Sequence, residues 1–252
     1  FPYTTLFRSE PFSVNRFMET KTFTIHRAAD RMMSDLGWLK SAHTFSFGRH
    51  YDPNRMGYAS LRVINDDRVQ QGGGFGTHPH DNMEIFSYVL NGALNHRDSM
   101  GNEASLKRGD LQLMSAGSGI THSEFNGNPD GETHFLQIWI EPNVLNAEPT
   151  YQEAHFSDED KTGVLRLMLS PDEAEGSLKI RQDARVYASI LRDGQSLGFT
   201  LPAGRYGWLH VADGEITVDG QLLKAGDAVE FGPTTLGLSS GSFGEFILFD
   251  LA

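Results

Sequence analysis

Pairs of histidine and carboxylate residues at alternating positions are the part of this sequence best suited to chemistry. His78 and His80 are separated by one proline, and His122 and Glu124 are separated by one serine. Residues i and i+2 of a β-strand project from the same face of the strand. Two adjacent strands that carry these pairs would bring four metal-binding groups to one point, so the spacing predicts a metal site.

Three neutral imidazoles and one carboxylate suit several ions, namely iron, nickel, copper, manganese or zinc. An octahedral ion would keep two open positions for dioxygen and a chelating substrate, which permits redox chemistry without an organic cofactor. The chain of 252 residues contains no cysteine. This excludes thiolate zinc sites, cysteine-bound iron–sulfur clusters, disulfides and a thiol nucleophile.

The charge balance limits the partners of the chain. Lys and Arg number 21 and Asp and Glu number 33, which gives a formal net charge of −12. Without an excess of cations, neither nucleic acid nor an anionic membrane is expected as a direct partner. No stretch of about 18 apolar residues is present, so no membrane span is predicted. Because no targeting segment is identified, the cytoplasm is the expected location.

The first 17 residues differ from the rest of the chain in that no folded element is expected in them. Residues 1–17 lack the apolar core of a secretory signal, which is about 7–15 residues long. The run Phe1–Ser9 resembles the translation of a common sequencing-adapter oligonucleotide, and the first methionine is Met18. We therefore expect residues 1–17 to be a non-native or disordered leader, and natural translation to start at Met18.

Short runs rich in β-branched, aromatic or other apolar residues dominate the rest of the chain. Turn residues such as Gly, Asn and Asp separate them, which predicts an all-β sandwich or barrel. The expected strands are Tyr58–Asn65, Glu84–Leu90, Leu111–Met114, Thr133–Ile140, Val164–Leu169, Val186–Leu191, Tyr206–Val211, Glu215–Val218, Ala228–Phe231 and Glu245–Leu251.

A proline-containing, acidic connector follows Ile140 and divides the chain into two expected domains, residues 18–143 and 144–252. Each half places a glycine between two strands and then a Gly-Asp turn, at Gly109-Asp110 and Gly226-Asp227. This rhythm fits a duplicated barrel, and it fits equally well the frequent use of Gly-Asp turns in β proteins.

Few segments favour other structures. Ala28–Leu39 is expected to hold a short helix and Asp172–Glu175 a helical turn. The acidic run Asp158–Asp160 is interpreted as a solvated loop. All three tryptophans are expected to serve in packing. They are Trp38, Trp139 and Trp208.

The metal-binding pairs lie within a recognisable motif. The spacing Gly72-x5-His78-x-His80-x3-Glu84 matches most of the first cupin motif, and Gly119-x2-His122-x3-Asn126 matches the second. Gly92 lies one residue later than usual, the second motif has two extra residues after Gly109, and Gly117 replaces its usual proline. More specifically, the runs HTFSF, YDPNRMG, LRVINDD, GFGTHPHDNMEI and MSAGSGITHSEFN closely resemble the pirin family, above all its bacterial quercetin 2,3-dioxygenases.

The resemblance covers Thr22–Ala252 and implies a bicupin, two packed double-stranded β-helix barrels, with one metal in the N-terminal barrel. Carried over residue by residue, it gives His78, His80, His122 and Glu124 as ligands, with Fe(II) the expected ion and Zn, Cu, Ni, Co or Mn as alternatives. Glu84 is expected to pack or to form a hydrogen bond nearby. The C-terminal half lacks an H-x-H pair, has only His210 near the corresponding strand, and is expected to be metal-free.

Other residues near the motif have weaker assignments. His43 and His96 could support the ligands or line a pocket, although structural roles are favoured for both. Phe47, Phe75 and Met114 could form a flat, apolar pocket for an aromatic substrate. An inward-facing apolar residue is more often ordinary core, so this pocket is a hypothesis.

By this resemblance, the chain is a dioxygenase that opens the heterocycle of a flavonol such as quercetin with O2 and releases CO and a depside. The flavonol would bind through its deprotonated 3-hydroxyl, and Glu124 would be both ligand and catalytic base. The alternative is a non-enzymatic metal-binding regulator, in which the metal senses redox state and the partner is another protein. Another cupin reaction, such as isomerisation or decarboxylation, is a third possibility. The family resemblance also implies a monomer.

Overall fold

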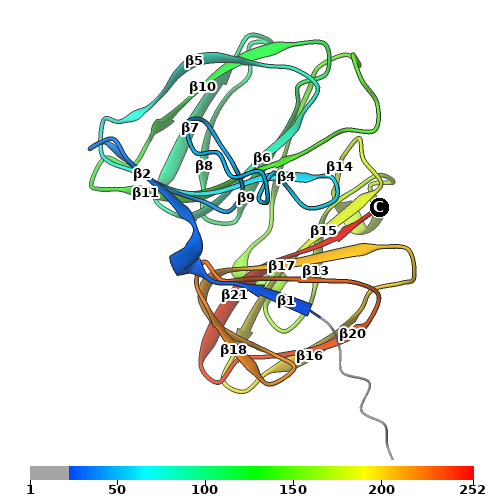
Figure 1. The fold of residues 1–252 in the computed structure, drawn as a ribbon. Coiled ribbons are helices and arrows are strands. Elements are labelled where there is room, and N and C mark those ends of the chain that lie inside the picture. Colours follow the sequence, from blue (N-terminus) through cyan, green and yellow to red (C-terminus); the bar gives the residue numbers. More distant parts are fainter. Residues whose placement is uncertain (1–22) are drawn as a thin grey trace, which may run out of the picture.

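The computed structural model describes residues 23–252, and these form two β-barrels stacked on one another (Figure 1). The all-β prediction is confirmed. Helical structure in the described range is confined to α1 (Asp158–Lys161) and the 3-10 turns η1 (Ala28–Asp30) and η2 (Ala174–Gly176). No helix among these residues is long and apolar enough to cross a membrane. The predicted leader, residues 1–17, lies outside the described part of the chain.

The first barrel consists of a seven-stranded sheet, β12-β9-β6-β11-β4-β3-β2, facing a four-stranded sheet, β5-β10-β7-β8. Alternating residues along these strands point into the barrel, and this places the histidines of β5 and β10 inside it. The strands are β2 (Met32–Asp35), β3 (Leu39–His43), β4 (Leu61–Val69), β5 (Gly74–His80), β6 (Glu84–Asn91), β7 (Ala93–Asp98), β8 (Glu103–Lys107), β9 (Asp110–Ser115), β10 (Ile120–Asn126), β11 (Thr133–Ile140) and β12 (Thr150–His155).

The second barrel repeats most of this pairing pattern. In the first barrel β11 pairs with β4 and β6, and in the second β21 pairs with β15 and the first part of β17. The regularity supports duplication over chance use of Gly-Asp turns. The strands are β13 (Arg166–Ser170), β14 (Leu178–Lys179), β15 (Ala184–Arg192), β16 (Ser196–Thr200), β17 (Tyr206–Val218), β18 (Gln221–Lys224), β19 (Ala228–Phe231), β20 (Thr235–Ser239) and β21 (Phe243–Leu251).

Each barrel also receives an edge strand from outside its own repeat. β1 (Phe23–His26), at the start of the described chain, pairs with β19, and β12 pairs with β9, the equivalent strand of the first barrel. Both additions cover edges that would otherwise expose unpaired backbone groups. β1 and β12 thus each pair with a strand on the other side of the predicted domain boundary between residues 143 and 144. That boundary stays a prediction.

Four local expectations differ from the structure. The segment Ala28–Leu39 holds a short helix only as the 3-10 turn η1, because β2 further along it pairs with β3 and Gly37, with φ +80°, makes the turn between them. The run Asp158–Asp160 is not a loop, since Ser157 and Asp160 form a capping box that starts α1. The strand expected at Tyr58–Asn65 begins only at Leu61, after a turn that Tyr58 and Leu61 close, and it continues to Val69. The helical turn expected at Asp172–Glu175 is η2, displaced by two residues.

The two barrels share a continuous apolar core. It includes Phe86 and Phe45 from the first barrel and Trp208 and Phe249 from the second. Trp208 is fully buried, and its ring centroid lies 5.2 Å from that of Phe45, as expected of a packing residue. A core shared in this way holds the barrels as one unit.

Candidate metal centre

Three histidines converge inside the first barrel. His78 and His80 lie on β5, and His122 lies on β10 directly opposite His78. The Nε2 atom of His122 is 3.1 Å from Nε2 of His78 and 3.0 Å from Nε2 of His80. Their donor atoms form one group that could hold a metal ion.

The separation of these nitrogen atoms indicates a coordination geometry. Two ligand atoms about 2.1 Å from an ion are about 3.0 Å apart at a right angle and about 3.4 Å apart at a tetrahedral angle. The observed 3.0 and 3.1 Å fit right angles. His122 would therefore occupy an octahedral position next to His78 and next to His80, with positions left for further ligands.

The protonation of the histidines also fits a metal. His78 donates from Nδ1 to the backbone oxygen of Gly76 over 2.8 Å, which leaves the Nε2 lone pair free. Burial and the neighbouring His78 lower the pKa of His80 to about 4. Burial and the surrounding histidines lower the pKa of His122 well below its ordinary value. Neutral imidazoles are the form that binds metals.

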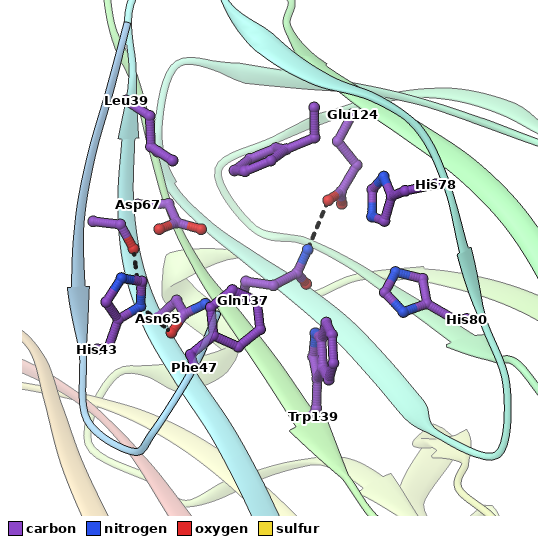
Figure 2. Close-up of a pocket in the computed structure, with 12 residues that line it drawn as sticks. Leu39, His43, Phe47, Asn65, Asp67, His78, His80, Glu124, Gln137 and Trp139 are labelled. Carbon is purple, nitrogen blue, oxygen red and sulfur yellow. Dashed lines mark hydrogen bonds between the residues drawn. The ribbon is translucent and has the colours of Figure 1, made fainter. Parts of the chain in front are cut away.

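Glu124 is buried beside this group but turned partly away from it. Its carboxylate accepts hydrogen bonds from Ser87 Oγ at 3.1 Å and from Gln137 Nε2 at 2.7 Å, and Figure 2 shows the latter contact. It belongs to a second possible metal group, with His96 and His122, that overlaps the first. Burial raises the pKa of Glu124 to about 7. Its role as fourth ligand stays a prediction.

Ser87 and Gln137 are functional residues that the sequence did not predict, although a signal was present. Ser87 interrupts the largely apolar run IFSYVL of β6, and Gln137 interrupts the apolar run FLQIWI of β11. Both side chains are buried, and they also contact each other, Ser87 Oγ to Gln137 Oε1 at 3.1 Å. A polar residue at an inward position of such a strand needs a hydrogen-bond partner, and here that partner is Glu124.

A small cavity of about 70 Å³ opens next to the histidines. Figure 2 shows His78, His80 and Glu124 on one side of it and His43, Asn65 and Asp67 on the other. Its remaining lining residues are largely apolar. They include Leu39, Phe47, Phe75 and Trp139.

The lining of this cavity agrees with the roles expected for Phe47 and Phe75 but not with those expected for Met114 and Trp139. Phe47 and Phe75 line it, as expected, whereas Met114 does not. The Met114 side chain is fully buried in an apolar cluster with Ile85 and serves as core. Trp139 is more than a packing residue, because it lines the cavity and its ring centroid lies 4.9 Å from that of His80.

The opposite wall of the cavity is polar. His43 lies in this wall and contacts Asn65 Oδ1 through Nδ1 at 2.7 Å and Ser34 Oγ through Nε2 at 2.8 Å. Burial lowers the pKa of His43. Burial raises the pKa of Asp67 to about 7. Near neutral pH this wall therefore offers a neutral imidazole and a carboxyl group that is close to half protonated.

Glu84 lies outside both possible metal groups. Its Oε2 accepts hydrogen bonds from Ser115 Oγ at 2.7 Å and from the backbone N–H of Arg181 at 3.2 Å. The hydrogen-bonding role expected for it is the one observed. Because Arg181 belongs to the second half of the chain, Glu84 links the two barrels.

The second barrel holds apolar residues where the first holds donors. The strand pairing aligns His78 with Phe199, His122 with Leu236 and Glu124 with Leu238. These three apolar side chains belong to the core of the second barrel. Both possible metal groups among residues 23–252 lie in the first barrel. His210 is buried at the opposite face of β17, outside both groups.

Two cupin barrels with a three-histidine group in only the first define a bicupin with one candidate metal centre. Family profiles agree with this class: the one described as Pirin matches residues 12–140, and the one described as Quercetinase C-terminal cupin domain matches residues 167–251. The chain belongs to the pirin family.

Individual relatives are similar over most of the chain. Quercetin 2,3-dioxygenase of Escherichia coli K12 is 42% identical over 229 residues, 90% of this chain and 97% of the relative. A pirin-like protein of Caulobacter vibrioides is 43% identical over 196 residues, 77% of this chain and 84% of the relative. The crystal structure of bacterial pirin YhhW from Escherichia coli in complex with nickel(II) matches with a TM-score of 0.86 and 40% identity, covering 91% of this chain and 99% of that one.

Proposed function

We propose that this chain is a metal-dependent dioxygenase of the pirin type, which opens the heterocyclic ring of a flavonol such as quercetin with O2 and releases CO. The convergence of three histidines, with Nε2 of His122 3.1 Å from His78 and 3.0 Å from His80, beside a partly apolar cavity is the observation that carries the proposal. The names of relatives at 42% identity support the substrate class.

His78, His80, His122 and Glu124 would hold one divalent transition metal. We propose Fe(II) as the native ion, with Zn, Cu, Ni, Co or Mn as alternatives. When bound, the metal would supply the redox chemistry toward O2 that the amino-acid side chains lack. The donor set fits such an ion because imidazole and carboxylate together suit borderline metals.

Glu124 has a second role in this proposal, as the base that takes the proton of the substrate hydroxyl. A pKa of about 7, raised by burial, suits a general base working near neutral pH. Ser87 and Gln137 donate hydrogen bonds to its two oxygens and so stabilise the charged form. They also fix the direction in which the carboxylate points.

Aromatic side chains would orient the substrate. Phe47 packs edge-on against Trp139, with ring centroids 5.4 Å apart, and stacks on His43 at 5.5 Å. Flat apolar walls of this kind bind planar aromatic molecules and exclude water. Asn65 and His43 would then offer hydrogen bonds to the polar substituents of the bound ring system.

The test is the loss of flavonol absorbance by the metal-loaded protein, measured with and without oxygen. The proposal requires oxygen-dependent loss and CO release with at least one of Fe, Cu, Ni, Co or Mn, and it requires that His78→Ala abolish both. His155→Ala is the matched control, because His155 contacts Asp110 on the outside of the same barrel. Stoichiometric metal binding without any turnover would refute the dioxygenase and favour the regulatory alternative. The cytoplasmic location, the monomeric state and a regulatory protein partner stay predictions.

A further inference from the structure

Four buried side chains form a compact block on two neighbouring strands of the first barrel. His96 and Asp98 lie on β7, and His122 and Glu124 lie on β10. The antiparallel register pairs Glu124 with His96 and His122 with Asp98. Side chains directly opposite one another in such a pair are neighbours on the same face. The block therefore joins two predicted ligands to a histidine and a carboxylate that the proposed function does not use.

The contacts inside this block form a chain that leads away from the metal site. His122 Nδ1 lies 3.4 Å from His96 Nδ1, and His96 Nε2 lies 3.6 Å from a carboxylate oxygen of Asp98. The His96 and Asp98 side chains are both 0% exposed. The His96 ring also stacks on Tyr151 with centroids 5.1 Å apart and an interplanar angle of 23°, which fixes its orientation.

One arrangement of protons gives His96 Nδ1 the role of acceptor for both of its neighbours. Asp98 lies on the Nε2 side of His96, 3.6 Å away and beyond hydrogen-bond distance, and its negative charge favours the tautomer with the proton on Nε2, in which Nδ1 is an acceptor. Gln112 Nε2, at 3.2 Å, donates to that same Nδ1. His122 must in turn carry its proton on Nδ1, and its Nε2 lone pair faces His78 and His80.

Asp98 is held in its charged form by its own loop. Its carboxylate accepts hydrogen bonds from the backbone N–H groups of Met100 at 2.9 Å and Asn102 at 3.0 Å, and from the Asn102 side chain at 2.8 Å. Donors of this kind stabilise a carboxylate. A fixed negative charge therefore lies behind His96.

The second barrel provides an independent comparison. There the register pairs Val218 with Leu238 where the first barrel pairs His96 with Glu124. The strand pairing likewise places Leu236 at the position of His122. The barrel that lacks the metal donors thus also lacks the His96 equivalent, as expected if His96 serves the metal site rather than the fold.

We propose that His96 is a positioning residue for His122. It accepts the Nδ1 proton of His122, fixes the tautomer that presents Nε2 to the metal, and passes the influence of the Asp98 charge to that ligand. Partners of this kind orient ligating histidines and raise their basicity. The proposal rests on the proposed metal site, and its test separates the two.

The test measures the dissociation constant and the visible absorption spectrum of Co(II) bound to the folded protein. His96→Phe keeps an aromatic ring against Tyr151 but removes the acceptor, and Co(II) binding is expected to weaken about 10–100-fold with a changed spectrum. His96→Asn keeps an oxygen acceptor near the Nδ1 position but leaves a larger void. If the hydrogen bond matters, the Asn variant binds Co(II) more tightly than the Phe variant, whereas a packing role reverses the order.

Three further variants make the result decisive. His155→Phe alters an exposed histidine–aspartate pair of the same barrel, contacts none of the ligands, and is expected to bind Co(II) as the wild type does. Unchanged Co(II) binding in Asp98→Asn would overturn the part assigned to Asp98. If His122→Ala retains the metal, the proposed metal site fails. If His122→Ala loses the metal while His96→Phe keeps wild-type affinity and spectrum, the role of His96 alone is refuted.

Discussion

His210 provides a quantitative test of how the interface between the barrels responds to pH. Its side chain is 1% exposed, and neither ring nitrogen has a hydrogen-bond partner among the described residues. Burial, reinforced by the charge of Arg31 and opposed by Asp66 and Asp227, lowers its pKa to about 3. The perturbation is His210→Leu, which removes the titratable group and fills the space with apolar atoms.

The sign and the size of the change in stability with pH follow from the different pKa of His210 in the folded and unfolded states. His210 stays neutral when folded, but an unfolded histidine has a pKa of about 6.5 and gains a proton as the pH falls. Its contribution to stability is therefore complete above that value and is lost toward acid. Between near pH 8 and near pH 5, the loss is RT ln(1 + 10^1.5), about 2 kcal/mol. This figure barely changes for any folded pKa below about 4.

The assay is equilibrium unfolding in guanidinium chloride of both proteins at both pH values, with a chelator present so that the metal site is constant. Asp67 and Glu124, whose pKa values burial raises to about 7, shift stability in the opposite direction but equally in both proteins. The advantage of His210→Leu over wild type should be about 2 kcal/mol larger at the lower pH. A difference that is the same at both pH values, within about 0.5 kcal/mol, would refute the neutral buried state of His210.

Three other perturbations test particular contacts. A ligating Glu124 must lose a proton with a pKa of about 7, so Co(II) affinity should depend on pH more strongly in wild type than in Glu124→Gln. From near pH 8 to near pH 6.5, the affinity should fall about fourfold more in wild type. An equal fall in both proteins would remove Glu124 from the ligand set. Lys161→Met should lower the free energy of unfolding by about 2–3 kcal/mol, because it removes the ammonium group 3.1 Å from the fully buried Glu245 carboxylate. Adding Glu245→Gln to this variant should recover part of that loss. Gly117→Ala should destabilise the chain by about 2 kcal/mol or more, since its φ is +50° and a Cβ would overlap a facing backbone carbonyl. Gly101, with φ +94° and open space around it, is the control, because Gly101→Ala introduces backbone strain alone. An equal loss of stability in both variants would exclude a contribution from the overlap.

The sequence predicted those features that depend on short spacing. The i, i+2 pairs on β5 and β10 bring His78, His80 and His122 together, because alternation within a strand is a local property. The capping box at Ser157 was also local, and it could have been recognised from Ser and Asp three residues apart. The acidic composition of that segment instead suggested a loop.

The features that were missed depend on pairing between distant strands. Ser87 and Gln137 meet Glu124 only because β6, β10 and β11 curve around the same interior, and no spacing within one segment shows this. The same holds for β2, which lies inside the segment Ala28–Leu39 that was expected to hold a short helix. Its register with β3 outweighs a weak helical preference.

The alternation of side chains along β6 explains how the second barrel, which lacks metal-binding side chains, supports the candidate metal centre of the first. Ser87 points inward to Glu124, whereas Phe86 and Tyr88 point outward into the core that both barrels share. Tyr88 donates a hydrogen bond to Glu245 on β21, so the second barrel holds β6 through polar as well as apolar contacts. Since a shift of β6 would move the Ser87 hydroxyl away from the Glu124 carboxylate, packing between the barrels sets the direction in which that carboxylate points. The second barrel therefore contributes to the candidate metal centre without touching it.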